Sequence, residues 1–124
     1  MKYYSEEHQW VDIEGGKARI GITKFAADEL GELSYVELPS VGSVFKQGDS
    51  LCVVESLKAA SDVFMPVGGK VVEVNAKLEK QPELVNEDAE GEGWICIVAD
   101  VNEDELAALM DEEKYLASLK RKSS

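Results

Sequence analysis

The chain has 124 residues, of which 44% are hydrophobic and 31% charged, a balance typical of one globular domain rather than of a disordered or fibrous protein. Twenty-five acidic residues against thirteen basic ones give a formal net charge of −12. Such a surface repels phosphate groups, so we expect neither nucleic acid nor an anionic membrane as a partner. No apolar run approaches the roughly 18 residues that a membrane-spanning helix needs.

The first half of the chain alternates short strand patterns with turns. A hairpin is predicted around residues 14–17, and Thr23 and Gly31 are the expected N-cap and end of a short internal helix. The predicted elements are strands at 9–13 and 18–22, a helix at 24–30, a strand at 34–38, a loop at 41–49, and strands at 51–56 and 61–65.

Glycine and proline also divide the next stretch of the chain. Gly68 and Gly69 predict a turn, and Val72 and Val74 are expected on one face of the strand that follows. The predicted elements are a strand at 70–74, a less regular segment at 77–86 in which Pro82 opens a helical turn, and a last strand at 94–99.

The C-terminal tail changes to helical spacing. Asn102 and Asp111 are the expected N-caps of two short helices, because both side chains can accept a backbone hydrogen bond. The apolar residues of these helices are Leu106, Leu109 and Met110 in the first, and Tyr115, Leu116 and Leu119 in the second. The chain is therefore predicted to be one mainly β domain over 1–124, with a core at about 3–100 and a helical tail at about 102–119.

Residues suited to catalysis are sparse. His8 is the one histidine, and no glycine-rich loop precedes a helix in the form that binds phosphate. Cys52 and Cys96 each lie in an apolar run without metal-ligand spacing, so we expect two buried reduced thiols, with a disulfide as the alternative. The sequence favours a protein that is not an enzyme.

Lys58 has an unusual position, ten residues after Gly48 and ten before Gly68. The two predicted strands on either side of it place the lysine at the tip of a hairpin. A lysine at such a turn is most simply a solubilising charge. The alternative is that the tip presents its amine for covalent modification by another enzyme.

The residues around Lys58 favour modification. The run at 54–62, Val-Glu-Ser-Leu-Lys-Ala-Ala-Ser-Asp, resembles the lipoylation motif of the glycine cleavage system H-protein family, which usually reads V-E-S-V-K-A-A-S-D. The resemblance covers about residues 3–119. Further matching segments are His-Gln-Trp-Val at 8–11, Gly-Ile-Thr at 21–23, Tyr-Val-Glu-Leu-Pro at 35–39, Pro-Glu-Leu-Val-Asn at 82–86 and Gly-Glu-Gly-Trp at 91–94.

This resemblance implies a barrel-sandwich hybrid fold, in which two small antiparallel sheets face each other. It implies that Lys58 carries one lipoate group in amide linkage, and that the protein is a carrier and not a catalyst. The implied partners are the P-protein (a pyridoxal-phosphate glycine decarboxylase), the T-protein (a tetrahydrofolate-dependent aminomethyltransferase), dihydrolipoyl dehydrogenase, and a lipoyl or octanoyl transferase or lipoate ligase. We expect a monomer in the bacterial cytoplasm, or in the mitochondrial matrix if the chain is processed.

The resemblance also suggests roles around the lysine. Glu55 and Gly69 match positions linked to recognition by lipoyl-attaching enzymes, although Glu55 also fits a strand-end charge and Gly69 a turn with positive φ, which we favour for Gly69. Ser61 and Asp62 are expected to shape the hairpin through local hydrogen bonds, and Asp62 can also contact the loaded arm. His8 is expected to be structural.

Gln9 departs from the family, which commonly has Glu between the His and the Trp. The family's acid lies near the loaded aminomethyl group when the arm rests on the protein surface. Gln9 keeps a hydrogen-bond acceptor but not the charge, unless Glu6 or Glu7 compensates. The alternative function is therefore an H-like paralogue that relays lipoyl groups to other enzymes. A biotin carrier is disfavoured, because Leu57 and Ala59 stand where its motif has methionines.

Overall fold

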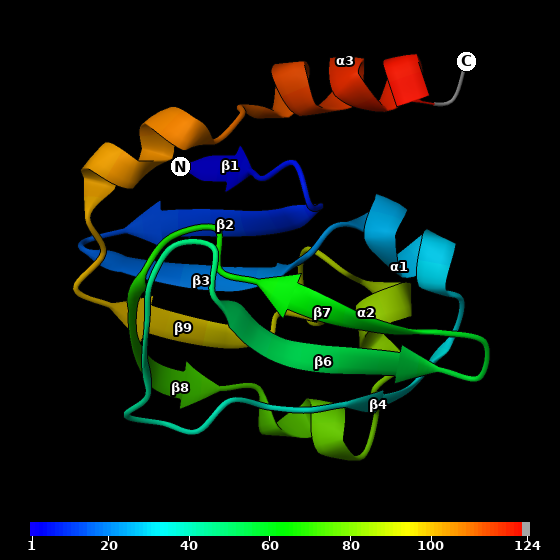
Figure 1. Ribbon diagram of the computed structural model, residues 1–124. Helices are drawn as coiled ribbons and strands as arrows, with labels where there is room; N and C mark the ends of the chain where they lie inside the picture. Colours follow the sequence, from blue (N-terminus) through cyan, green and yellow to red (C-terminus); the bar gives the residue numbers. More distant parts are fainter. Residues whose placement is uncertain (123–124) are drawn as a thin grey trace.

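The computed structural model describes residues 1–122, which fold into two antiparallel sheets with short helices at their edges (Figure 1). The strands are β1 Lys2–Tyr4, β2 Gln9–Glu14, β3 Lys17–Ile22, β4 Leu33–Val36, β5 Val44–Phe45, β6 Ser50–Ser56, β7 Ala60–Phe64, β8 Gly69–Val74 and β9 Cys96–Ala99. The helices are α1 Lys24–Leu30, the 3-10 helix η1 Ala76–Glu79, α2 Leu84–Glu87, the 3-10 helix η2 Glu103–Ala108 and α3 Glu112–Lys122. No helix within the described residues is long and apolar enough to cross a bilayer.

The two sheets differ in the sequence separation of the strands that they pair. The larger has the strand order β1-β2-β3-β9-β8-β5, so that β3 pairs with a strand from the far end of the chain. The smaller has the order β4-β6-β7, in which β6 and β7 form a hairpin. This arrangement confirms the predicted mainly β fold with two facing antiparallel sheets.

The hydrophobic core lies between the sheets and includes side chains from both. Val11 and Ile20 are fully buried on the large sheet, as are Val54 on β6 and Val63 on β7. Burying each such side chain contributes roughly 1.5–3 kcal/mol to stability. These buried side chains therefore anchor the β6–β7 hairpin to the large sheet.

The helix α1 forms where its caps predict. The Thr23 side chain accepts a hydrogen bond from the Ala26 backbone N–H at 3.2 Å. Gly31 ends the helix with φ 81° and ψ −173°, a combination that is essentially restricted to glycine. The Asn86 side chain then fastens this end of α1 to the α2 segment.

The prediction for Gly69 was wrong, because Gly69 does not lie in a positive-φ turn but opens β8. A Cβ at this position would lie 2.7 Å from the Ala99 carbonyl oxygen on the neighbouring strand, so close approach of the backbones explains the glycine. A register shift between Val71 and Glu73 also changes the face of the strand. As a result, Val71 is buried while Val72 is exposed, contrary to the expectation that Val72 and Val74 share a face.

Other segments differ from prediction where tertiary contacts decide. The expected loop at 41–49 contains the short edge strand β5, and the segment 77–86 contains parts of η1 and α2. Asn102 does cap its helix, but η2 is a 3-10 helix that ends before Leu109. Met110 instead forms a β-bridge with Tyr4, through backbone hydrogen bonds of 2.8 Å in both directions.

The second tail helix begins as predicted, with the Asp111 carboxylate accepting from the Lys114 N–H at 2.8 Å. Tyr115 is buried and stacks on Tyr4, with ring centroids 4.7 Å apart. Leu116, expected on the packed face, is 51% exposed. The tail is thus held by the β-bridge of Met110, by the buried Tyr115 with its ring and hydroxyl contacts, and by partly buried apolar side chains, while Leu116 faces outward.

Candidate functional site at a hairpin tip

Lys58 lies at the tip of the β6–β7 hairpin, which projects at the edge of the molecule near α1 (Figure 1). The last cross-strand pair is Glu55 with Ala60. Lys58 is exposed, and its neighbour Leu57 is 99% exposed. The structure therefore presents the amine on a short turn supported by a buried sheet, as the sequence predicted.

Ser56 organises this turn, a role that sequence reasoning missed. Its backbone N–H donates to the Ala59 carbonyl at 2.8 Å. Its hydroxyl accepts from the backbone N–H groups of Ala59 at 3.2 Å and Lys58 at 3.4 Å. A serine that begins a tight turn is a known signal for such bonds, and it stands two residues before the lysine in the sequence.

The Lys58 side chain folds toward α1. Its Cε lies 3.3 Å and its Nζ 3.8 Å from the position that a Cβ on Gly31 would occupy. Gly31 also lines an open hollow of about 380 Å³ between α1 and α2. The hollow is bordered by the acidic side chains of Asp28, Glu32, Glu83 and Glu87.

The other predicted site residues near the motif lie on the same small sheet. Glu55 is exposed at the end of β6. Asp62 is exposed on β7 and accepts a hydrogen bond from Ser50 at 3.0 Å across the hairpin, while the Ser61 hydroxyl makes only a 3.4 Å contact with the Asp62 carbonyl. The side-chain hydrogen bonds of the turn itself are made by Ser56. Gly69 lies in the other sheet, on β8.

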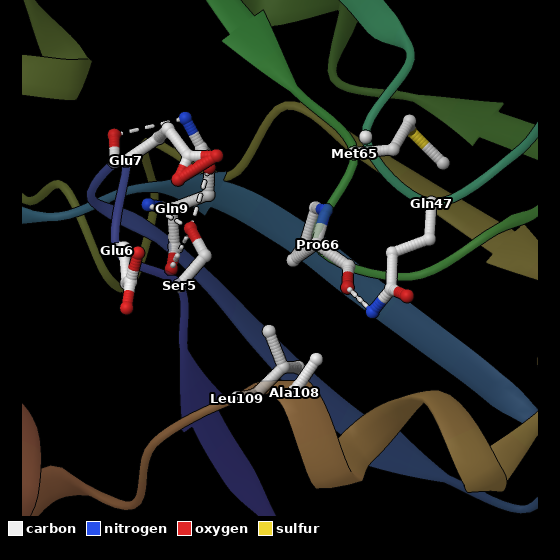
Figure 2. A pocket seen from close by; sticks show the side chains of 10 residues that line it. Ser5, Glu6, Glu7, Gln9, Gln47, Met65, Pro66, Ala108 and Leu109 are labelled. Carbon is white, nitrogen blue, oxygen red and sulfur yellow. Dashed lines mark hydrogen bonds between the residues drawn. The ribbon is translucent and has the colours of Figure 1, made fainter.

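Gln9 lines a small cavity of about 160 Å³ together with Ser5, Glu6, Glu7 and residues from three other segments (Figure 2). It is 3% exposed, and its amide is occupied within the protein. The Ser5 hydroxyl donates to Gln9 Oε1 at 2.5 Å, and Gln9 Nε2 donates to the Glu7 carbonyl at 3.0 Å. Figure 2 shows these three residues on one side of the cavity and Gln47, Met65 and Pro66 on the other.

His8 and the two tryptophans make contacts within the framework of the fold. His8 has a positive φ of 69°, and its Nδ1 lies 2.8 Å from the Tyr115 hydroxyl. Trp10 is buried and donates to the Ala89 carbonyl at 2.9 Å. Trp94 is only partly buried, with the Arg19 guanidinium 5.5 Å from its ring centroid.

The two cysteines are buried and free, as predicted. Burial raises the pKa of the Cys96 thiol to about 12. Burial, with a further contribution from Cys96, raises the pKa of the Cys52 thiol still more. Because the thiolate is the reactive form, neither cysteine is suited to act as a nucleophile at neutral pH.

Comparison with known proteins agrees with the geometry of the hairpin. The profile of the family described as "Glycine cleavage H-protein" matches residues 2–122. The chain is 49% identical over 115 residues to the glycine cleavage system H protein of Thermotoga maritima, covering 93% of each. It is 51% identical over 120 residues to the probable H protein of Pyrococcus furiosus, covering 95% of this chain and 89% of the relative.

A solved structure shows the same fold. The crystal structure of a glycine cleavage system H protein from Mycobacterium marinum superposes with a TM-score of 0.85 at 34% identity, covering 96% of each chain. The match extends over both sheets and the tail, not only over the hairpin. The chain belongs to the glycine cleavage H-protein family.

Proposed function

We propose that Lys58 is the residue through which this H protein carries its lipoyl group. As a member of its family, the chain is a lipoyl carrier of the glycine cleavage system and not a catalyst. The observation that supports Lys58 is its place at an exposed hairpin tip within the run Val-Glu-Ser-Leu-Lys-Ala-Ala-Ser-Asp.

The hairpin tip is suited to carry an acylated lysine. The turn residues around Lys58 are exposed, so an attaching enzyme can approach the amine from several directions. Ser56 and the buried residues of β6 hold the root of the side chain in place. When bound, the lipoyl group supplies the thiol chemistry that takes up the aminomethyl group of glycine and hands it on.

The partners follow from membership of the system. We propose that the hairpin tip enters the active sites of the P-protein, the T-protein and dihydrolipoyl dehydrogenase in turn, and of a lipoyl or octanoyl transferase or lipoate ligase beforehand. The exposed Glu55 and Asp62, on the two strands that lead to the tip, are placed to contact such enzymes or the loaded arm. The relatives come from bacteria and archaea, which supports the cytoplasm as the compartment.

For Gly69 we favour a structural role over enzyme recognition. Its Cβ position is occupied by the neighbouring strand, and this close approach is sufficient to require glycine. Its location in the large sheet also separates it from the strands that carry the tip.

Gln9 supports a second candidate function, a relay of lipoyl groups to other enzymes. Its amide is buried and bonded to Ser5 and Glu7, so it offers no charge to a cationic aminomethyl end. Glu6 and Glu7 line the same cavity and are exposed, and we propose that they supply the charge. With the charge supplied by Glu6 and Glu7, the protein can serve glycine cleavage without an acid at residue 9, and the relay function is then not needed to explain Gln9.

The experiment that tests the attachment site compares intact masses of wild type and Lys58→Arg, both expressed with a lipoate ligase and lipoate. Wild type is expected to gain one lipoyl group and the variant none. Lys58→Arg keeps the charge and length of the side chain but cannot form the amide. Equal modification of both proteins would move the attachment site away from Lys58.

A second measurement separates the two candidate functions. The lipoylated protein is expected to support glycine–bicarbonate exchange by the P-protein. Glu6→Gln combined with Glu7→Gln is expected to reduce that exchange more than Glu103→Gln, an exposed residue of η2 that serves as the control. No exchange with fully lipoylated wild type would favour the relay.

A further inference from the structure

Gly31 is the residue against which the Lys58 side chain rests. A Cβ at Gly31 would approach Lys58 Cε to 3.3 Å, which is tighter than an ordinary van der Waals contact. The backbone of Gly31 has φ 81° and ψ −173°, where a side chain is also unfavourable. The backbone conformation therefore requires glycine here, and the missing side chain leaves room for the lysine.

Asn86 fixes the position of this glycine. Its Nδ2 donates to the carbonyl oxygens of Gly31 at 2.8 Å and Ala27 at 3.3 Å. Its Oδ1 accepts from the backbone N–H of Leu33 at 2.9 Å. One side chain thus joins the last turn of α1, the linking glycine and the start of β4, although it lies more than fifty residues later in the chain.

We propose that Gly31, held by Asn86, is a seat for the Lys58 side chain and that this seat orients the lysine for the enzyme that attaches the lipoyl group. The inference rests on Lys58 being the attachment residue. A long side chain that is already ordered loses less conformational freedom when it enters an active site. Gly31 and Asn86 are positioning residues, since they act through the lysine.

The seat predicts restricted motion of Lys58 before any modification. In protein labelled with carbon-13 at lysine Cε, the order parameter of Lys58 is expected to exceed that of Lys80, an exposed lysine after η1. The Lys58→Arg spectrum identifies the signal. Asn86→Ala is expected to lower the Lys58 order parameter toward that of Lys80, because the glycine is then no longer fixed.

The chain offers a matched control for Asn86. Asn75 is also an asparagine whose Nδ2 donates to two carbonyls, those of Glu92 and Trp94, both at 2.8 Å. Asn75→Ala is expected to destabilise the protein without changing the motion of Lys58. A merely structural role of Asn86 would give the two variants the same Lys58 signal.

A second pair of variants keeps the test valid if Asn86→Ala does not fold. Gly31→Ala adds a methyl group against the lysine, whereas Gly42→Ala strains a glycine with φ 97° that has no neighbour within 4 Å of its Cβ position. The Lys58 signal is expected to shift in Gly31→Ala and to stay unchanged in Gly42→Ala.

Kinetics of lipoate ligase then connect the seat with attachment. Asn86→Ala is expected to raise KM by about two- to tenfold, the range that ordering one long side chain is worth, with little change in kcat. Two results would overturn the proposed seat. One is a wild-type order parameter of Lys58 equal to that of Lys80. The other is an equal change of the Lys58 order parameter in Asn86→Ala and Asn75→Ala. Absence of a lipoyl mass gain in wild type would instead overturn the attachment site, since the NMR measurement uses unmodified protein.

Discussion

Ser56 and Gly21 show how single residues fix the parts of the molecule that matter for the carrier. Ser56 uses one hydroxyl to hold two backbone N–H groups of the turn. Gly21 lies opposite Trp10 on β2, where a Cβ would come within 2.7 Å of the indole nitrogen. One residue sets the shape of the tip, and the other leaves room for a buried ring.

For Ser56→Ala we expect a local effect. Because the hydroxyl is near the surface, the free energy of unfolding should fall by less than about 1 kcal/mol. The Ala59 backbone N–H loses its partner, so its hydrogen exchange should accelerate. Ser61→Ala is the control, since its hydroxyl makes only the 3.4 Å contact. Unchanged exchange at Ala59 would contradict the role given to Ser56.

Gly21→Ala should destabilise the whole protein. The added methyl group cannot be placed without moving Trp10, which also donates a hydrogen bond to Ala89. Overpacking of this kind costs roughly 1–3 kcal/mol. Urea denaturation followed by tryptophan fluorescence measures it. Gly15→Ala is the control for backbone strain without overpacking, because Gly15 has φ 58° and no atom within 4 Å of its Cβ position. A loss in Gly21→Ala no larger than that in Gly15→Ala would contradict the steric role given to Trp10, because Gly21 has no positive φ.

At the scale of elements, the sequence predicts what is determined locally. Helix α1 occupies the predicted residues because Thr23 and Gly31 act within one turn of it. The pattern at 51–56 and 61–65 predicts the hairpin, and hence the site of Lys58, to within one residue. In contrast, β5 has two residues and exists only because β8 lies beside it.

The remaining misses have the same cause. The bulge that turns Val72 outward depends on the register with β9, and the contact between Gly31 and Lys58 joins segments that have no pattern in common. Asn86 bonds to residues 53 to 59 positions away. Such contacts are decided by the assembled sheets, and one sequence alone carries no signal for them.

The attachment of α3 should depend on the Tyr115 hydroxyl. It lies 2.7 Å from the Thr23 hydroxyl and 2.8 Å from His8 Nδ1, so it links the tail to the cap of α1. Tyr115→Phe keeps the stacking on Tyr4 but removes both contacts, at a cost of about 1–2 kcal/mol. Faster hydrogen exchange along α3, with little change in β6, is the expected result. Tyr35→Phe, at an exposed tyrosine, is the control.

For the whole molecule, buried protonated groups make stability sensitive to alkali. Burial raises the pKa of Tyr4 and Tyr115, with additional contributions from neighbouring acids, although the bond to Thr23 opposes the rise for Tyr115. Burial raises the pKa of Cys96 from 9.0 to about 12. In each case the unfolded state releases the proton at a lower pH than the folded state does.

The free energy of unfolding is therefore expected to be constant for these groups below about pH 9 and to fall above it. Between pH 9 and 12 the unfolded chain ionises at Cys96 while the folded protein does not, which costs roughly 1.4 kcal/mol per pH unit for this group. Urea denaturation from pH 7 to 11 measures the decline. Cys96→Ala should show a smaller decline than wild type. A stability that stays constant up to pH 11 would contradict this account.

The strand order has a consequence for synthesis on the ribosome. The sheet β4-β6-β7 is complete once Phe64 has emerged, but β3 has only β2 beside it until Cys96–Ala99 has been made. Through that interval the nascent chain presents an open strand edge, which is where other chains can pair. The strands of the hairpin bearing Lys58 are thus synthesised before the strand that completes the large sheet. A modifying enzyme that acts only on the fully folded protein can therefore modify the chain only after β9 has been synthesised.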